Sequence, residues 1–239
     1  MKCSIVIAIY NSHEIVRRQL LHFENIGIPD DMELILVDDG SEPPLFDEMN
    51  LKNCFFIETK DKRRWTQGLA RMRGIEAARG EYIFCTDIDH IISKEAMDFA
   101  RSFDGDKAVF KRRFAYLDEF GFLVTDKQKV LDWGLLEAAI RDEHLSDGVH
   151  GNTWLMKKSI FYALGGYSRK RCESGTHLQG EDRAFNKQWS NAVRAGKYAA
   201  QVTGPPIYYF PMGKYHKTGD DNPHGLFHDM VKEKWGDAN

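Results

Sequence analysis

The chain has 239 residues, of which 42% are hydrophobic and 29% charged, the composition of a globular protein that can build a full core. Its 33 basic and 36 acidic residues give a net charge of −3. This balance argues against nucleic acid and against an anionic membrane surface as partners, because both attract proteins mainly through an excess of positive charge.

Cysteine spacing and hydropathy exclude further classes of protein. The four cysteines form no C-x-x-C pair, which argues against a zinc site or a disulfide framework and favours a reducing compartment. No run approaches the ~20 apolar residues of a membrane span, and residues 1–10 suit a first strand better than a signal peptide. We therefore predict a cytoplasmic protein with no integral membrane segment; attachment to a membrane surface through a lipid-linked substrate stays open.

Strands and helices alternate through the first hundred residues. The β-branched run 4–9 predicts a strand that is covered on both faces. Asn11 and Glu14 predict a capping box for the next helix, which ends near Gly27. Further strands are expected at 33–37, 54–58 and 81–85, with a helix at 67–78. This βαββαβ-like order predicts a mostly parallel central sheet with helices on both faces.

The second half of the chain is less regular. Strands are expected at 109–114, 122–125 and 153–156, and helices at 132–141, 159–164 and 181–195. The tail after Pro205-Pro206 is rich in Gly, His, Asp and aromatic residues, which is typical of an ordered loop or lid more than of a core. No composition shift marks a linker, so we expect one α/β domain over 1–239. We expect this domain to have two halves, 1–100 and 101–239, the second of which includes the C-terminal loop.

The strand at 81–85 leads into Asp87-Ile88-Asp89, the most informative segment of the chain. Residues two apart in an extended chain point to the same side, so Asp87 and Asp89 can face one ligand while Ile88 turns to the core. Two carboxylates at a strand end suit a divalent cation, which in turn suits a diphosphate. The alternative is that these acids only end a strand and begin a turn.

Two more candidates lie in the first half, where ligands of open α/β sheets bind beyond the carboxyl ends of the strands. Asp39 follows the strand at 33–37 and can accept the N3–H of uracil or a ribose hydroxyl, although an Asp-Gly pair also favours a simple turn. Arg71 lies among small apolar residues of its helix. If it is buried it needs a phosphate or a site carboxylate as partner; the alternative is a surface arginine.

The second half offers a base and a metal ligand. Asp182 opens a helix and can take a proton from an acceptor hydroxyl, although acids in a first helical turn also complement the helix dipole. His216 can complete a metal shell when the tail closes, which would shift the preference from Mg²⁺ toward Mn²⁺. It can equally be a surface residue, and His224 and His228 compete for the same role.

Taken together, these segments resemble the inverting GT-A glycosyltransferases of family 2. The matching segments, in the family's order, are 4–11, 37–41, 68–75, 78–89 and 165–182. The C-terminal half is also similar to the β-1,4-galactosyltransferases of family 7, through Gly165-Gly166-Tyr167, Gly180-Glu181-Asp182 and Tyr215-His216. The chain departs from these patterns at Ala8, where a proline is common, at Met72, where an asparagine is frequent, and at Leu178-Gln179, where galactosyltransferases carry a tryptophan. The last departure leaves the sugar and acceptor preference open.

The resemblance implies a GT-A fold and a single Rossmann-like domain over 1–239. In that domain 1–100 is the nucleotide-binding half and 101–239, with the C-terminal loop, the acceptor-binding half. The resemblance also implies a role for each motif. Asp182 is the implied base, with Glu181 beside it as a second catalytic residue, and Asp39 is the implied uracil contact. The implied nucleotide-binding residues are Ile9, Tyr10, Asn11, Asp39, Arg71, Asp87 and Ile88. The implied metal ligands are Asp87, Asp89 and His216.

We therefore expect transfer of a sugar, with inversion, from a UDP-sugar to the hydroxyl of a saccharide or other acceptor, assisted by Mn²⁺ or Mg²⁺. One alternative is a non-catalytic module that binds nucleotide sugars, since a fold does not imply a function. Another is a sugar-1-phosphate nucleotidyltransferase, which needs a Gly-rich phosphate loop after the first strand. Residues 8–12 have no glycine there, which argues against that class.

Overall fold

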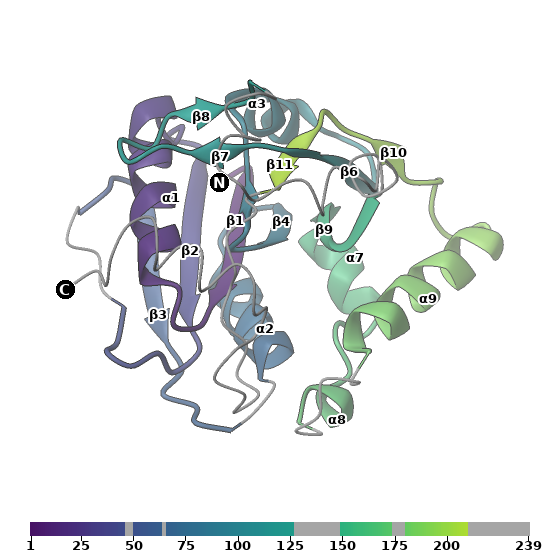
Figure 1. The fold of residues 1–239 in the computed structure, drawn as a ribbon. Helices are drawn as coiled ribbons and strands as arrows, with labels where there is room; N and C mark the ends of the chain where they lie inside the picture. Colours follow the sequence, from purple (N-terminus) through teal and green to yellow (C-terminus); the bar gives the residue numbers. More distant parts are fainter. Residues whose placement is uncertain (46–49, 64–65, 127–148, 174–179, 210–239) are drawn as a thin grey trace.

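The computed structural model describes residues 1–45, 50–63, 66–126, 149–173 and 180–209 (Figure 1). The strands are β1 (Cys3–Ile9), β2 (Met32–Asp38), β3 (Cys54–Glu58), β4 (Tyr82–Asp87), β5 (His90–Ile91), β6 (Lys107–Phe114), β7 (Tyr116–Leu117), β8 (Leu123–Val124), β9 (Val149–Lys157), β10 (Val202–Thr203) and β11 (Ile207–Tyr209). The helices are α1 (His13–Ile26), α2 (Gln67–Ala77), α3 (Lys94–Ser102), α7 (Lys158–Ala163), α8 (Arg169–Cys172) and α9 (Glu181–Arg194).

One large sheet has the strand order β3-β2-β1-β4-β9-β6-β11-β5, with β10 paired to β6, and β7 and β8 form a separate hairpin. Strands β3, β2, β1 and β4 run parallel, while β9 lies antiparallel between β4 and β6. Every residue of β1, β2 and β4 is buried, as expected for strands covered on both faces. The predicted α/β fold with a mostly parallel sheet is confirmed.

Two hydrophobic cores lie on opposite faces of this sheet. Alternate residues of β1 point to opposite sides: Ile5, Ile7 and Ile9 pack with α1 and α3, and Val6 and Ala8 pack with α2, α7 and α9. Figure 1 shows α1 and α3 at the left and top of the sheet, with α2, α7 and α9 below and to the right. The helices on both faces explain why β1 is a continuous apolar run.

A glycine brings α2 close to the sheet. A Cβ added at Gly74 would lie 2.5 Å from Cγ1 of Val6 and 2.9 Å from Cγ2 of Val37, closer than side chains pack in real cores. The absence of a side chain at Gly74 therefore lets α2 lie directly against β1 and β2. This close approach carries the first turn of α2 to the carboxyl ends of the strands.

The start of α1 differs from the prediction. Ser12, not Asn11, occupies the position before the helix, and its side chain makes no capping hydrogen bond. The Asn11 backbone has a positive φ of 46°, and its side-chain Oδ1 accepts a hydrogen bond from the Glu42 backbone N–H at 2.8 Å. Glu14 forms ion pairs with arginines of α1, among them Arg18 at 2.8 Å. The predicted capping box is wrong because Asn11 holds the loop after β2 instead.

The second half contains elements that the sequence did not indicate. Strand β9 extends beyond the expected 153–156, and β5 and α3 were not predicted. The tail after the prolines was expected to be a loop, but Ile207 is fully buried and β11 pairs with β6 and β5. The expected helix at 132–141 lies outside the described residues.

Cysteines and helix lengths complete the description of the fold. The four cysteines are free thiols. Over the part of the chain that the structure describes, none of the helices combines the length and apolar character needed to cross a membrane.

Candidate active site

The carboxyl ends of β1, β2 and β4 meet at one edge of the sheet. Ile9 pairs with Asp38 across β1 and β2, in parallel register. Ala8 pairs with Asp87 across β1 and β4, and the backbone N–H of Asp39 donates to the Ile9 carbonyl at 2.8 Å. The three strand ends that were predicted to converge therefore lie side by side.

Asp38 ends β2 and Asp39 follows it, and the two residues have different roles. Oδ1 of Asp38 accepts the backbone N–H of Ser41 at 2.8 Å, and Oδ2 accepts that of Leu45 at 2.9 Å. These bonds shape the turn after β2. The turn that was the alternative interpretation of the Asp-Asp-Gly segment is thus made by Asp38, which leaves Asp39 for another task.

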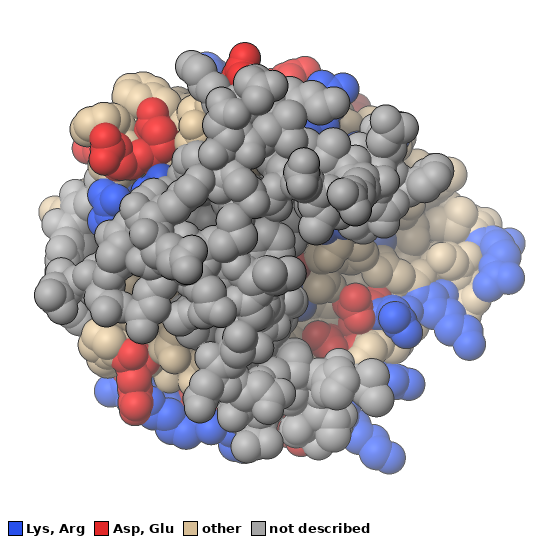
Figure 2. Space-filling model, in the orientation of Figure 1, with Lys and Arg blue, Asp and Glu red and all other residues tan. Residues whose placement is uncertain are grey.

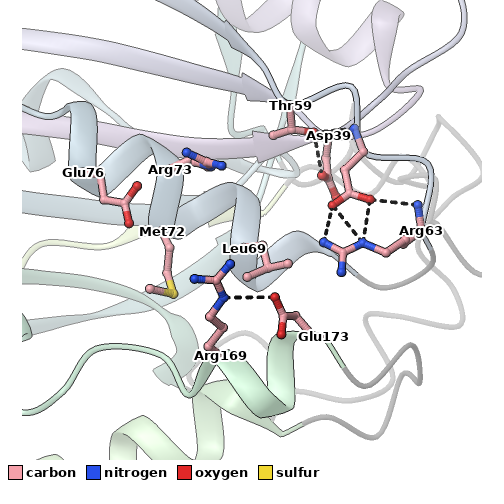
Figure 3. A pocket seen from close by; sticks show the side chains of 10 residues that line it. Asp39, Thr59, Arg63, Leu69, Met72, Arg73, Glu76, Arg169 and Glu173 are labelled. Atoms are coloured by element: carbon pink, nitrogen blue, oxygen red, sulfur yellow. Dashed lines mark hydrogen bonds and ion pairs between the residues drawn. The ribbon is translucent and has the colours of Figure 1, made fainter.

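Asp39 is buried, and hydroxyl groups hold both of its carboxylate oxygens. Oδ1 accepts from Thr59 Oγ1 at 3.1 Å, and Oδ2 accepts from Thr66 Oγ1 at 2.7 Å. Asp39 also lines a cavity of about 190 Å³ that runs along the outer face of α2 to α8 (Figure 3). Arg63 and Arg169 stand on two sides of this cavity. Asp39 is thus a fixed carboxylate at the wall of a polar cavity.

Arg71 is fully buried on α2, so the surface-arginine alternative is wrong. Its Nη2 forms an ion pair with Asp87, and its Nη1 lies 3.8 Å from Oε1 of Glu181 on α9. Burial opposes the charge, yet the neighbouring anions, Asp87 first among them, hold the pKa of Arg71 above its ordinary value. Gln67, at the start of α2, donates to Asp87 Oδ1 at 3.3 Å. Arg71 thus joins β4 to α9.

Part of the buried Arg71 guanidinium makes no described hydrogen bond. Among the described residues, Nε and Nη1 of Arg71 have no hydrogen-bond partner. A buried donor without an acceptor is costly, and a planar guanidinium is well suited to two oxygens of a phosphate or carboxylate. The chemistry of the site therefore favours an anionic group next to Arg71.

Asp87 also belongs to a group of metal-ligating side chains. One ligand atom each from Asp87, His90 and His150 lies within 4.8 Å of the others, and Nδ1 of His150 is 3.7 Å from Asp87 Oδ2. The His90 ring is held at Nδ1, which lies 3.2 Å from the Thr86 hydroxyl and 2.9 Å from that of Thr153. One carboxylate and two imidazoles form a donor set that fits a transition-metal ion such as Mn²⁺.

Asp89 and Ile88 lie in the turn between β4 and β5. Ile88 is in the core, as expected, and Asp89 is buried with 4% of its surface exposed. The extended geometry assumed for the Asp-X-Asp segment ends at Asp87, and Asp89 is not one of the three grouped residues. His216, His224 and His228 lie outside the described residues.

Sequence reasoning missed His90 and His150. His90 directly follows Asp89, so its place beside the carboxylates could have been noticed. His150 is the second residue of β9, close to the undescribed residues 127–148, and no motif marks it. The antiparallel pairing of β9 with β4 brings His150 to the site, and this long-range pairing leaves no local signal.

The first turn of α9 faces the same region. Gly180 precedes it in a left-handed conformation with a φ of 57°, and this glycine has no side chain that could cap the helix. Glu181 points to Arg71, and Oδ1 of Asp182 accepts the Arg183 backbone N–H at 2.7 Å. A Cβ built at Gly151 of β9 would be 3.7 Å from Oδ2 of Asp182. Asp182 thus lies against Gly151 of β9, the residue that follows His150 in the chain. Figure 2 shows acidic side chains in a hollow beside α9, with basic side chains along its outer rim.

The remaining predicted nucleotide contacts divide into two kinds. The side chains of Ile9 and Ile88 are in the core, so only their backbone can meet a ligand. Tyr10 is half-buried, and the Asn11 backbone N–H donates to Ser41 Oγ at 2.9 Å. Asn11 therefore supports the loop beside Asp39.

Comparison with known proteins identifies the class of this site. The family Glycosyl transferase family 2 matches residues 4–164, and the chain belongs to this family. A poly(ribitol-phosphate) beta-glucosyltransferase of Bacillus spizizenii is 36% identical over 103 residues, which are 41% of this chain and 16% of that protein. The protein EpsH of Bacillus subtilis is 33% identical over 96 residues, 38% of this chain and 27% of that protein.

Solved structures of other proteins have a fold similar to that of this chain. S. aureus TarS 1–349 in complex with UDP-GlcNAc has a TM-score of 0.55 at 16% identity, over 92% of this chain and 61% of that one. The same fragment without that ligand gives a TM-score of 0.54, over 87% and 60%. The chain thus spans under a third of its curated relatives and about three fifths of TarS 1–349. The family match ends at Leu164, so the similarity to family 7 stays a prediction.

Proposed function

We propose that the protein transfers a sugar from a UDP-sugar to an acceptor hydroxyl with inversion. The observation that carries the proposal is that the start of α2 links Asp39, Asp87 and, through Arg71, the first turn of α9. The names of the similar proteins support this reaction: one is a poly(ribitol-phosphate) beta-glucosyltransferase, and TarS was solved with UDP and with UDP-GlcNAc.

The nucleotide lies at the carboxyl ends of β1, β2 and β4 in this proposal. A carboxylate can accept several hydrogen bonds at once, so Asp39, which lines the cavity, can accept the N3–H of uracil. Arg71 offers buried donors to a phosphate oxygen. Asp87, held by Arg71 and Gln67, faces the ribose or the metal.

Asp182 acts as the base. It takes the proton of the acceptor hydroxyl while the oxygen attacks the anomeric carbon in line with the departing UDP. Glu181, the second residue that the resemblance implied, points to Arg71 at 3.8 Å and holds the helix start. The acceptor is a saccharide or another polyol, bound by the second half of a single catalytic domain over 1–239.

A divalent cation, when bound, supplies a Lewis acid that neutralises charge on the leaving diphosphate. The resemblance assigns Asp87, Asp89 and His216 to it, and the described residues offer Asp87 with His90 and His150. Asp87 is common to both sets. Imidazole ligands favour Mn²⁺ over Mg²⁺, which prefers oxygen, and we propose Mn²⁺.

The test is a panel of nucleotide sugars with a set of polyol and saccharide acceptors, read by release of UDP with Mn²⁺ and with EDTA. We expect turnover with a UDP-sugar, lost with EDTA. Asp182→Asn should lower kcat at least 1,000-fold while UDP binding, measured by calorimetry, changes less than about twofold. Asp98→Asn, an exposed carboxylate on α3, is the matched control. UDP binding without turnover in any pair would support the non-catalytic alternative, and equal loss of binding and turnover in Asp182→Asn would refute the base.

A further inference from the structure

A lysine without a described carboxylate partner is buried beneath α9. Lys107 begins β6 and has only 2% of its surface exposed. Burial lowers its pKa to about 8, because taking an ammonium ion out of water disfavours its charge. A buried charge of this kind is costly and calls for directed contacts.

The described contacts of the Lys107 side-chain nitrogen are with residues of α9. Nζ donates to Oδ1 of Asn186 at 2.9 Å and lies 5.8 Å and 5.3 Å from the ring centres of Phe185 and Trp189. Asn186 in turn donates from Nδ2 to the Gly151 carbonyl at 3.1 Å. We call Lys107, Asn186 and Gly151 the Lys107 strap, since they connect β6, α9 and β9.

The strap reaches the first turn of α9. Asn186 follows Asp182 by four residues, which places both on one face of the helix. A Cβ built at Gly151 would lie 3.3 Å from Nδ2 of Asn186 and 3.7 Å from Oδ2 of Asp182, so Gly151 faces both side chains. Gly180, the residue before α9, has no side chain that could cap the helix, so contacts one turn along the helix have a large part in fixing where Asp182 lies.

We propose that Lys107 is a positioning residue, which sets the place of Asp182 against β9 by holding Asn186. The proposal rests on the function given above, with Asp182 as base. An apolar residue of similar length would fill the same space without a buried charge, and such replacements are often neutral or stabilising. Such a variant would lose the directed hydrogen bond to Asn186. The position of α9 relative to β9 would then be less well fixed.

Lys107→Met is the test, with Lys187→Met on the exposed side of α9 as the matched control. We expect Lys107→Met to lower kcat by about 10- to 100-fold, the loss that follows from misplacing a reacting group by about 1 Å. The donor KM, the UDP affinity and the melting temperature should stay as in the wild type, or the melting temperature should rise. Lys187→Met should match the wild type in all four quantities.

Other outcomes separate the two proposals. A wild type that releases no UDP from any donor overturns the function, whereas an active wild type with an unchanged kcat in Lys107→Met overturns the strap. A melting temperature and UDP affinity that fall together with kcat would assign Lys107 a structural role only. If Lys107→Met does not fold, Asn186→Asp serves instead: it keeps an acceptor for Lys107 but cannot donate to Gly151, and the same loss of kcat with unchanged UDP affinity is expected.

Discussion

The two sides of the site are held in place by different means. On the proposed nucleotide side, Asp39 directly follows the buried strand β2 and Asp87 ends the buried strand β4, and the backbone ladder between β1, β2 and β4 fixes their spacing. On the proposed acceptor side, Asp182 lies on a helix that single buried charges connect to the rest of the fold, Arg71 through Glu181 and Lys107 through Asn186. The backbone hydrogen bonds between strands persist when one side chain is replaced, whereas each contact of α9 with Arg71 or Lys107 depends on a single pair of side chains. The acceptor side should therefore be the more sensitive to point substitutions.

The largest effect is expected where the two sides meet. Arg71→Met removes the guanidinium that forms an ion pair with the buried Asp87, and breaking a buried pair in this way costs about 3–5 kcal/mol. Urea unfolding measures this loss. Arg73→Met, on the exposed face of the same helix, should stay within about 0.5 kcal/mol of the wild type, and Arg71→Met/Asp87→Asn should recover part of the stability. A loss in Arg71→Met no larger than in Arg73→Met would show that Arg71 does not join the two sides.

Substitutions at the adjacent residues Asp38 and Asp39 distinguish a role in UDP binding from a role in stability. Asp39→Asn removes the charged acceptor proposed for uracil and should weaken UDP binding about 10- to 100-fold, since hydrogen bonds to charged groups contribute roughly 1.5–3 kcal/mol. Asp38→Asn disturbs the turn after β2 and should lower the free energy of unfolding by about 1 kcal/mol with little effect on UDP affinity. Calorimetric titration measures the UDP affinity of each variant, and urea unfolding measures its free energy of unfolding. The reverse pattern, with Asp38 controlling UDP affinity, would exchange the roles of the two residues.

The nucleotide side was largely predictable because its signals are local. The run at 4–9 is apolar because both faces of β1 are covered, and the acids at 38–39 and 87 stand where parallel strands end. The Asn11 capping box failed although it also used local residues. The reason is that the Asn11 side chain has a competing partner, the Glu42 backbone N–H, more than thirty residues away.

The acceptor side was less predictable because its contacts join distant segments. In the sequence Lys107 has no feature that separates it from other charged residues, because its burial depends on the packing of β6, β9 and α9. His150 and Asp87, which lie together in the structure, are more than sixty residues apart in the chain. Asp182 was predicted from the Gly-Glu-Asp motif and its place at a helix start. Asn186 and Gly151, which we propose to position it, belong to no motif, since one hydrogen bond between two common residue types has no periodicity.

The smallest expected effect is a pH dependence of stability that belongs to Lys107. The folded chain releases the Lys107 proton near pH 8, whereas the unfolded chain keeps it to about pH 10.5. Between these values the unfolded state binds more protons, so the free energy of unfolding increases with pH relative to a variant without the amine. From pH 7 to pH 9 the wild type should gain about 1 kcal/mol over Lys107→Met. Urea unfolding of both proteins at each pH measures this, and titrations common to both cancel in the difference. A difference that stays constant with pH would mean that Lys107 keeps an ordinary pKa, and that the contact with Asn186 is made by a hydrated ammonium ion.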